Sequence, residues 1–236
     1  MKNFIVYNGI QLSDYGVFIS GNGTYNAPER DTTEVEIPGR NGSLTLDNGR
    51  YKNIEVKYPA FIYSDFAVNV EAVRNILLDS AKYVRIEDTY HPDKFRIGKY
   101  KGGFTVKPIP ELYAGEFELT FDCYPQRFLK SGEDPIEFTS AGIIHSKYLK
   151  DAKPLIRAYG TGSFSIGGVS IQITAANVYT DIDTELQEAY KDNLLDPKNG
   201  NVVLTDGSYP VLKFGDNAVT MSGITKLIIY PRWWVL

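Results

Sequence analysis

Apolar and polar residues alternate along much of this chain, and a two-residue period is typical of half-buried β-strands. The alternation is clearest over residues 116–124, which we therefore expect to form a strand. One face of this strand carries Phe117, Leu119, Phe121 and Cys123, and the other carries Glu116, Glu118, Thr120 and Asp122. Residues 54–58 alternate in the same way. On this pattern, Cys123 is expected to be a core residue rather than a reactive thiol.

One segment of the first half has a helical period instead. An apolar residue recurs at each turn from Phe66 to Leu77, which predicts a helix over residues 65–79. Ser64 or Asp65 is placed to cap the start of this helix with a side-chain oxygen. The rest of the first half is predicted to form strands. These strands are expected at 4–7, 83–90, 94–100 and 104–109.

Residues 37–53 combine turn signals with a short strand. Pro, Gly and Asn residues gather at 38–42 and again at 48–49. They favour tight turns, because proline fixes φ and glycine or asparagine accepts φ > 0. Between the turns a strand is expected at 43–46, with its two leucines on one face. The charged residues at the turns are Arg40, Asp47 and Arg50. Taken alone, the stretch predicts a surface hairpin.

The periodic pattern stops between residues 125 and 135, where two prolines, a glycine and mixed charges predict a linker. We place a domain boundary there, which gives domains of 1–130 and 131–236. The second domain is predicted to consist of short strands between Gly- and Asn-rich turns, as in a β-sandwich or barrel. The strands are expected at 154–159, 162–166, 169–174, 177–183, 201–205, 209–215, 218–222 and 226–231. Residues 186–195 have a weak helical period that allows one helical turn.

Composition narrows the classes of function. The chain has 236 residues, a net charge of −4 and a pI of about 5.3, with no run rich in Lys and Arg. It therefore lacks the basic patch that nucleic-acid recognition requires. No apolar stretch approaches the length of a membrane span, and the first residues lack the apolar core of a signal peptide, so we expect synthesis and folding in a cytoplasm. The 17 tyrosines suit β structure and binding surfaces.

The sequence offers few candidates for chemistry. Residues 160–168 are rich in glycine but lack the ending of a phosphate loop, so hairpin turns are expected there. Asp181, Asp183 and Glu185 lack the pattern of an EF-hand calcium loop, and the two aspartates are expected on a solvated strand face.

The histidines and the single cysteine likewise provide no candidate for a metal site or for catalysis. His91 and His145 lack the local spacing of a zinc site and are both expected at the surface. The single cysteine excludes an intrachain disulfide. We therefore assign no catalytic, cofactor-binding or metal-binding residue, and we expect neither a cofactor nor enzyme activity.

Trp233 and Trp234 lie close to the end of the sequence. Exposed tryptophans can stack on sugar rings, whereas tryptophans that follow a last strand more often close a core or a subunit interface. We favour packing for at least one of them, and sugar stacking stays open as the alternative.

The stretch from Pro38 to Arg50 resembles a run found in the N-terminal domain of phage distal tail proteins. That run has the pattern P-G-R-x-G-x-L-x-x-D-x-G-R. Elements of the second half also follow the order seen in distal tail proteins of siphophages that infect Gram-positive bacteria. They are Tyr159-Gly160-Thr161-Gly162, Ile182-Asp183, Ala189-Tyr190, the segment 209–217 and Pro231-Arg232-Trp233-Trp234. The chain is therefore identified as similar to the distal tail protein (Dit) family of such phages or prophages.

The resemblance implies a mainly β protein. It implies a ring-forming N-terminal domain of β-sheets and one α-helix over 1–130, and a galectin-like β-sandwich over 131–236. Such proteins form the distal tail hub, a structural part of the virion that joins the tail tube to the tail tip or baseplate. The implied partners are further copies of the chain in a hexameric ring, the tail tube protein, a tail-associated tip protein, and receptor-binding or baseplate proteins. The implied location is the virion tail tip, after synthesis in the host bacterial cytoplasm.

Two other classes of function stay open. A carbohydrate-binding, lectin-like protein that attaches to the host cell wall is the first alternative, although the chain has no room for an inserted carbohydrate-binding module. A hydrolase of cell-wall glycans has little support from the residues.

Overall fold

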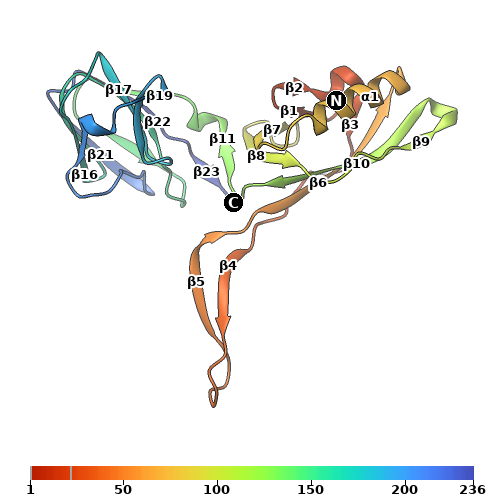
Figure 1. The fold of residues 1–236 in the computed structure, drawn as a ribbon, viewed down its shortest axis with the longest axis horizontal. Helices are drawn as coiled ribbons and strands as arrows, with labels where there is room; N and C mark the ends of the chain where they lie inside the picture. The colour runs from red at the N-terminus through yellow and green to blue at the C-terminus, as the bar shows by residue number, and fades with distance from the viewer. Residues whose placement is uncertain (1, 22) are drawn as a thin grey trace. The chain divides into compact units, whose positions relative to one another are not determined.

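The computed structural model describes residues 2–21 and 23–236, which fold into two compact units (Figure 1). The first unit runs to Arg127 and includes Leu236, and the second runs from Phe128 to Val235. Both are built mainly from antiparallel strands, so the prediction of a mainly β protein is confirmed. The galectin-like character of the second unit and the boundary near residue 130 stay predictions.

The first unit is built on one antiparallel sheet with the strand order β2-β1-β7-β8-β10-β6-β3. Its strands are β1 (Ile5–Tyr7), β2 (Ile10–Gln11), β3 (Val17–Ile19), β6 (Ile54–Tyr63), β7 (Val84–Asp88), β8 (Lys94–Tyr100) and β10 (Ala114–Cys123). The short strand β9 (Lys107–Ile109) pairs with β10. Two further strands, β4 (Arg30–Val35) and β5 (Leu44–Tyr51), form a separate hairpin.

The centre of this sheet is the long ladder between β6 and β10, which runs from the pair Ile54–Cys123 to the pair Tyr63–Ala114. Alternate residues of β6 are buried, as the sequence pattern predicts, because one face of the sheet covers the core. Leu119, Phe121 and Cys123 of β10 lie in that core. The expectation that Cys123 is a core residue is confirmed, and burial raises the pKa of its thiol to about 12.

The predicted helix is present as α1 (Phe66–Leu78), and it buries Val73 and Leu77. The expected cap is wrong. Asp65 occupies the N-cap position in a left-handed conformation, and no side chain in the described part of the chain caps the first turn. Instead, the Asn69 side chain donates a hydrogen bond to the Ser64 carbonyl oxygen at 2.8 Å. The short 3-10 helices of this unit are η1 (Leu12–Tyr15) and η2 (Pro110–Leu112).

The second unit consists of two antiparallel sheets that share one core. The first sheet has the order β12-β22-β14-β17-β18-β19 and the second has the order β13-β21-β15-β16-β20. The first contains β12 (Ile136–Phe138), β14 (Leu155–Tyr159), β17 (Tyr179–Asp183), β18 (Glu188–Lys191), β19 (Asn193–Pro197) and β22 (Lys226–Tyr230). The second contains β13 (Gly142–Ser146), β15 (Gly162–Ile166), β16 (Val169–Ile173), β20 (Val202–Leu204) and β21 (Gly215–Ser222). Ile156 and Ile182 of the first sheet pack in the same core as Ile166 and Ile171 of the second, so this unit is a β-sandwich.

Four short elements remain, and the first of them begins at Arg127, the residue before the boundary between the units. They are β11 (Arg127–Leu129), η3 (Lys130–Gly132), η4 (Asn199–Asn201) and β23 (Trp234–Val235). The predicted linker is therefore structured over part of its length. The backbone N–H of Leu129 donates to the Trp233 carbonyl oxygen, and that of Arg232 donates to the Gly132 carbonyl oxygen, each at 2.8 Å.

Two local predictions for the second unit are wrong. Residues 186–195 form parts of β18 and β19 rather than a helical turn. The predicted strand at 209–215 is not present as a strand. Within this range, Leu212 forms an isolated bridge with Ala152, and Gly215 is the first residue of β21. The hairpin turns expected at 160–168 are confirmed, since β14, β15 and β16 follow one another there.

Candidate functional site

The hairpin of β4 and β5 projects from the sheet of the first unit as an arm (Figure 1). The two strands pair with each other and with none of the other described strands. Almost every residue of the arm is exposed. A two-stranded hairpin of this kind is only marginally stable in water, so the arm depends on polar contacts between its strands or on cover from a partner.

Charged side chains link the two strands of the arm. Arg30 donates two hydrogen bonds to the Asp47 carboxylate, at 2.9 and 2.7 Å, and Arg50 donates one to Asp31 at 2.6 Å. Hydrogen bonds from these two arginines lower the pKa of Asp47 and of Asp31. Near the tip, the Ser43 and Thr45 hydroxyls donate to the Glu34 carboxylate and lower the pKa of Glu34. These contacts fix the register of the arm but do not bury its apolar residues.

The arm carries exposed apolar side chains next to its polar contacts. They are Val35, Ile37, Leu44 and Leu46, each between 37% and 48% exposed. Leu44 lies opposite Val35 in the ladder, and Leu46 lies two residues further along the same strand, so these side chains share a face. A projecting arm with an apolar face is a candidate surface for assembly with another subunit.

The sequence prediction for this stretch is correct at its tip and wrong at its base. The first turn and the exposed hairpin are present, with the two leucines on one face. Asn48-Gly49 does not form a second turn, because β5 continues through it to Tyr51. The positive φ of Gly49 accompanies a shift of register between Arg30 and Thr32 on the opposite strand. The glycine therefore marks a β-bulge.

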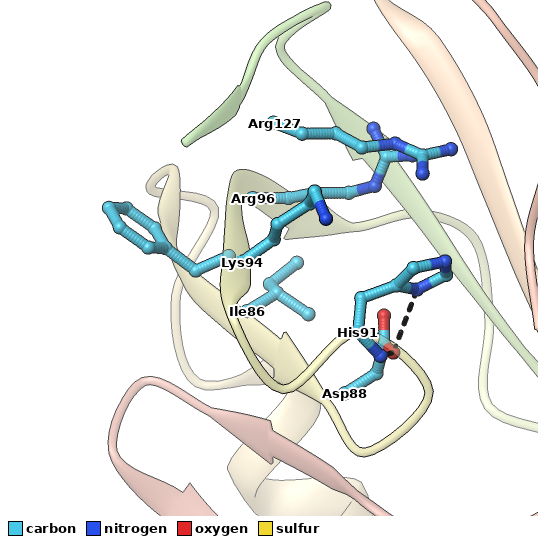
Figure 2. Close-up of a pocket in the computed structure, with 7 residues that line it drawn as sticks. Ile86, Asp88, His91, Lys94, Arg96 and Arg127 are labelled. Atoms are coloured by element: carbon cyan, nitrogen blue, oxygen red, sulfur yellow. Dashed lines mark hydrogen bonds and ion pairs between the residues drawn. The ribbon is translucent and has the colours of Figure 1, made fainter. Parts of the chain in front are cut away.

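A small polar pocket lies on the sheet of the first unit (Figure 2). It is lined by Ile86, Asp88, His91, Lys94, Phe95, Arg96 and Arg127. The Asp88 carboxylate accepts hydrogen bonds from the Tyr58 hydroxyl and from the His91 backbone N–H, each at 2.8 Å, and contacts His91 Nδ1 at 3.1 Å. This carboxylate is thus already held by neighbouring groups.

Two arginines face the same pocket. Arg96 is buried, with 5% of its surface exposed, and its Nη2 has no hydrogen-bond partner among the described residues. Arg127 donates from Nη2 to the carbonyl oxygens of Thr24 and Asn26, at 3.0 and 3.3 Å, while its buried Nε likewise has no partner in the described part of the chain. Burial and the neighbouring charge of Arg96 lower the pKa of Arg127. The pocket thus gathers buried positive charge and unused N–H donors.

The sequence prediction missed this pocket. It placed His91 at the surface, whereas the side chain is 18% exposed and contacts Asp88, so that prediction is wrong. In the predicted strand 94–100, Arg96 alternates with the apolar residues Phe95 and Ile97, which favours a solvated side chain, so no sequence signal marked its burial. His145 lies on an exposed part of β13, where its Nδ1 contacts Asp216 at 2.6 Å, so its predicted surface position is confirmed.

The expected solvated face at Asp181 and Asp183 is also wrong. Both carboxylates are buried, with 2% and 3% of their surface exposed. Arg157 donates two hydrogen bonds to Asp181, at 2.6 and 2.9 Å, and Arg232 donates two to Asp183, both at 2.8 Å. Such forked contacts satisfy each carboxylate within the protein. The two aspartates therefore hold the second unit together.

The expected packing of at least one tryptophan is confirmed. Trp233 is buried in the core of the second unit, and its ring centre lies 5.6 Å from that of Tyr148. Trp234 is partly exposed, and its Nε1 donates to the Asp151 carbonyl oxygen at 2.9 Å. Burial leaves the Trp233 ring little surface for stacking on a sugar, and the indole N–H of Trp234 is already used.

No group of three or more potential metal ligands occurs within residues 2–21 and 23–236. In the same part of the chain, no helix has the length and apolar character needed to cross a membrane. The features that stand out are the arm and the polar pocket of the first unit.

Residues 10–123 match the siphophage tail family whose model is described as the phage tail protein RIFT-related domain. This segment contains the arm and most of the first sheet. Among curated proteins, none matches the chain.

Solved structures extend the likeness over nearly the whole chain. The crystal structure of the Dit protein of SPP1, described as a paradigm of the hub adsorption apparatus in phages that infect Gram-positive hosts, matches with a TM-score of 0.74 at 14% identity, covering 97% of this chain and 98% of that one. A chain of the phage P2 baseplate in its activated conformation with Ca matches with a TM-score of 0.53 at 8% identity, and a chain of the phage p2 baseplate with Sr matches with 0.50 at 9%, each over 97% of both chains. Together with the family match, these findings confirm the resemblance to siphophage distal tail proteins.

Proposed function

We propose that this protein is a structural subunit of the distal tail hub of a siphophage or a prophage, where the tail tube meets the tail tip or baseplate. The observation that carries the proposal is the match of residues 10–123 to a phage tail family within a chain whose whole fold resembles a hub protein. We also propose that it has no enzyme activity, that the host cytoplasm is its site of synthesis, and that the virion tail tip is its final location.

The arm supports assembly into a homo-oligomeric ring. Its apolar face is exposed on a single chain, and exposed apolar patches on projecting elements are typical of assembly surfaces. A head-to-tail contact between identical subunits closes most simply into a ring. We propose that residues 1–130 form this ring, that the ring is hexameric, and that its neighbours are the tail tube protein, a tail-associated tip protein and receptor-binding or baseplate proteins.

The test is a reconstruction of the tail tip by electron microscopy, together with the mass of the purified protein in solution. We expect density for a ring of this chain and, where the ring forms without the tube, a mass that is a multiple of 26.5 kDa. A monomer in solution is compatible with the proposal if the tube is needed as a template. A tail tip that contains no ring of this protein would contradict it.

The lectin alternative is tested separately on a glycan array with the purified protein. Since both tryptophans are engaged within the second unit, we expect no specific glycan signal. A strong signal for cell-wall glycans would favour the alternative, whether or not the ring forms.

A further inference from the structure

The polar pocket of the first unit has one positive charge more than its negative charges, and it has buried N–H donors without hydrogen-bond acceptors in the described part of the chain. Arg96 and Arg127 bring two positive charges to the pocket, and Asp88 brings one negative charge (Figure 2). Lys94 is already paired with Asp93 at 2.7 Å. Close to the two guanidinium groups, one positive charge is therefore left without compensation.

The unused donors point to the same deficit. Arg96 Nη2 and Arg127 Nε are buried N–H groups without an acceptor in the described part of the chain. Asp88 does not serve them, because its carboxylate is held by Tyr58 and His91. A buried N–H group without an acceptor destabilises the fold. A ligand that supplies an acceptor would remove this cost, and the gain in free energy would favour its binding.

The size of the cavity limits the ligand. Its volume is about 10 Å³, which is room for one water-sized group. A whole phosphate or sulfate ion would not fit inside, but one oxygen of an anion can enter while its remaining atoms stay outside. The single uncompensated positive charge matches a monovalent carboxylate better than a divalent sulfate or phosphate. Because Lys94 and His91 in the pocket wall are only partly buried, the rest of the ligand can stay in solvent.

We propose that this pocket is a binding site for a single carboxylate, which accepts hydrogen bonds from Arg96 and Arg127 and neutralises their excess charge. Arginine is suited to this role because its planar guanidinium presents several donors to a carboxylate. The ligand class is a carboxylic acid anion, either a free small molecule or an acidic side chain of another protein.

The experiment follows the Nε–Hε signals of the arginines by nuclear magnetic resonance in the full-length protein. Sodium formate and the amide of N-acetylaspartate are titrated at constant ionic strength, with sodium chloride, sodium sulfate and the amide of N-acetylasparagine as controls. We expect the signals of Arg96 and Arg127 to shift to saturation with the carboxylates only. Saturation by formate alone would assign the site to a free small carboxylate. Saturation by formate and by the amide of N-acetylaspartate would show that the site also accepts the acidic side chain of another protein.

Variants connect the signal to the pocket. Arg127→Gln and Arg96→Met each remove the excess charge, and each is expected to weaken formate binding at least tenfold. Arg74→Gln, on the exposed face of α1, is the matched control and should bind formate as the wild type does. If Arg96→Met fails to fold, Arg127→Gln decides the result. Two outcomes would overturn the proposal: no saturation by any carboxylate, as for a pocket that holds only water, or equal saturation by sulfate.

Discussion

At the scale of single residues, the ion pair between Asp183 and Arg232 is the clearest case of stability that depends on two side chains. The Asp183 side chain is 4% exposed and that of Arg232 is 33% exposed. Asp183→Asn would leave the guanidinium without its counter-charge, and we expect a loss of about 3 kcal/mol in the free energy of unfolding, at the lower end for buried pairs. Urea denaturation measures this loss.

The matched control is Glu185→Gln, because Glu185 pairs with Lys153 at 3.2 Å in an exposed position. Exposed pairs contribute about 0–1 kcal/mol, so the midpoint should hardly move. Equal losses for the two variants would show that the burial of Asp183 does not matter.

The same carboxylate makes stability depend on pH. Burial alone would raise the pKa of Asp183, but the hydrogen bonds from Arg232 and from backbone N–H groups outweigh burial and lower it below 3.8. A carboxyl with a lowered pKa stabilises the fold above the pKa of the unfolded chain, and this contribution is lost as the pH falls through the folded value. We expect the urea midpoint of the wild type to fall more steeply below about pH 4 than that of Asp183→Asn. Parallel pH profiles would contradict this assignment.

The two tryptophans should differ in a melting experiment. Trp233→Ala removes a buried ring and is expected to cost about 3–5 kcal/mol. Trp234→Ala removes a partly exposed ring with one hydrogen bond and should cost less. Binding to host cell walls is measured on the same variants. Unchanged melting of both variants with lost binding would favour the lectin alternative.

At the scale of elements, the arm is expected to serve assembly rather than folding. Leu44→Ser combined with Leu46→Ser should leave the melting temperature nearly unchanged, because both side chains are exposed on the single chain. The same double variant should weaken the ring, as measured by native mass spectrometry or by its density in tail tips. Leu195→Ser, at a position that is 93% exposed in the second unit, is the control for the loss of a surface leucine. If the double variant forms normal rings, the apolar face of the arm does not contribute to the ring interface.

Elements with local signals were predicted well, and those that depend on distant partners were not. The strand at 116–124 and the helix at 65–79 follow from the spacing of their own apolar residues. The burial of Asp183 could not be predicted, because its partner Arg232 is distant in sequence and only the fold brings the two together. The pocket was missed for the same reason, since Arg96 and Arg127 come from different elements.

At the scale of the whole molecule, the second unit is expected to fold alone, but its starting residue matters. Leu129 and Gly132 both bond to the C-terminal segment through their backbones. A fragment 128–236 keeps both contacts, whereas a fragment 131–236 loses the one from Leu129. We therefore expect cooperative unfolding of both fragments, with a lower midpoint for the shorter one. Circular dichroism during thermal melting provides the measurement, and an unfolded longer fragment would refute the independence of this unit.

The central ladder of the first unit has a consequence for synthesis. During synthesis, one edge of β6 can pair at once with β3, which precedes it in the chain. The other edge stays unpaired until β10 has been synthesised. The wait covers about 60 residues, which at about 5–20 residues per second lasts roughly 3 to 12 seconds. During that time a strand with one apolar face and an open edge leaves the ribosome without its partner. Crowded polysomes are therefore where this protein is most exposed to wrong pairing between nascent chains, and slower translation between β6 and β10 should increase the aggregated fraction.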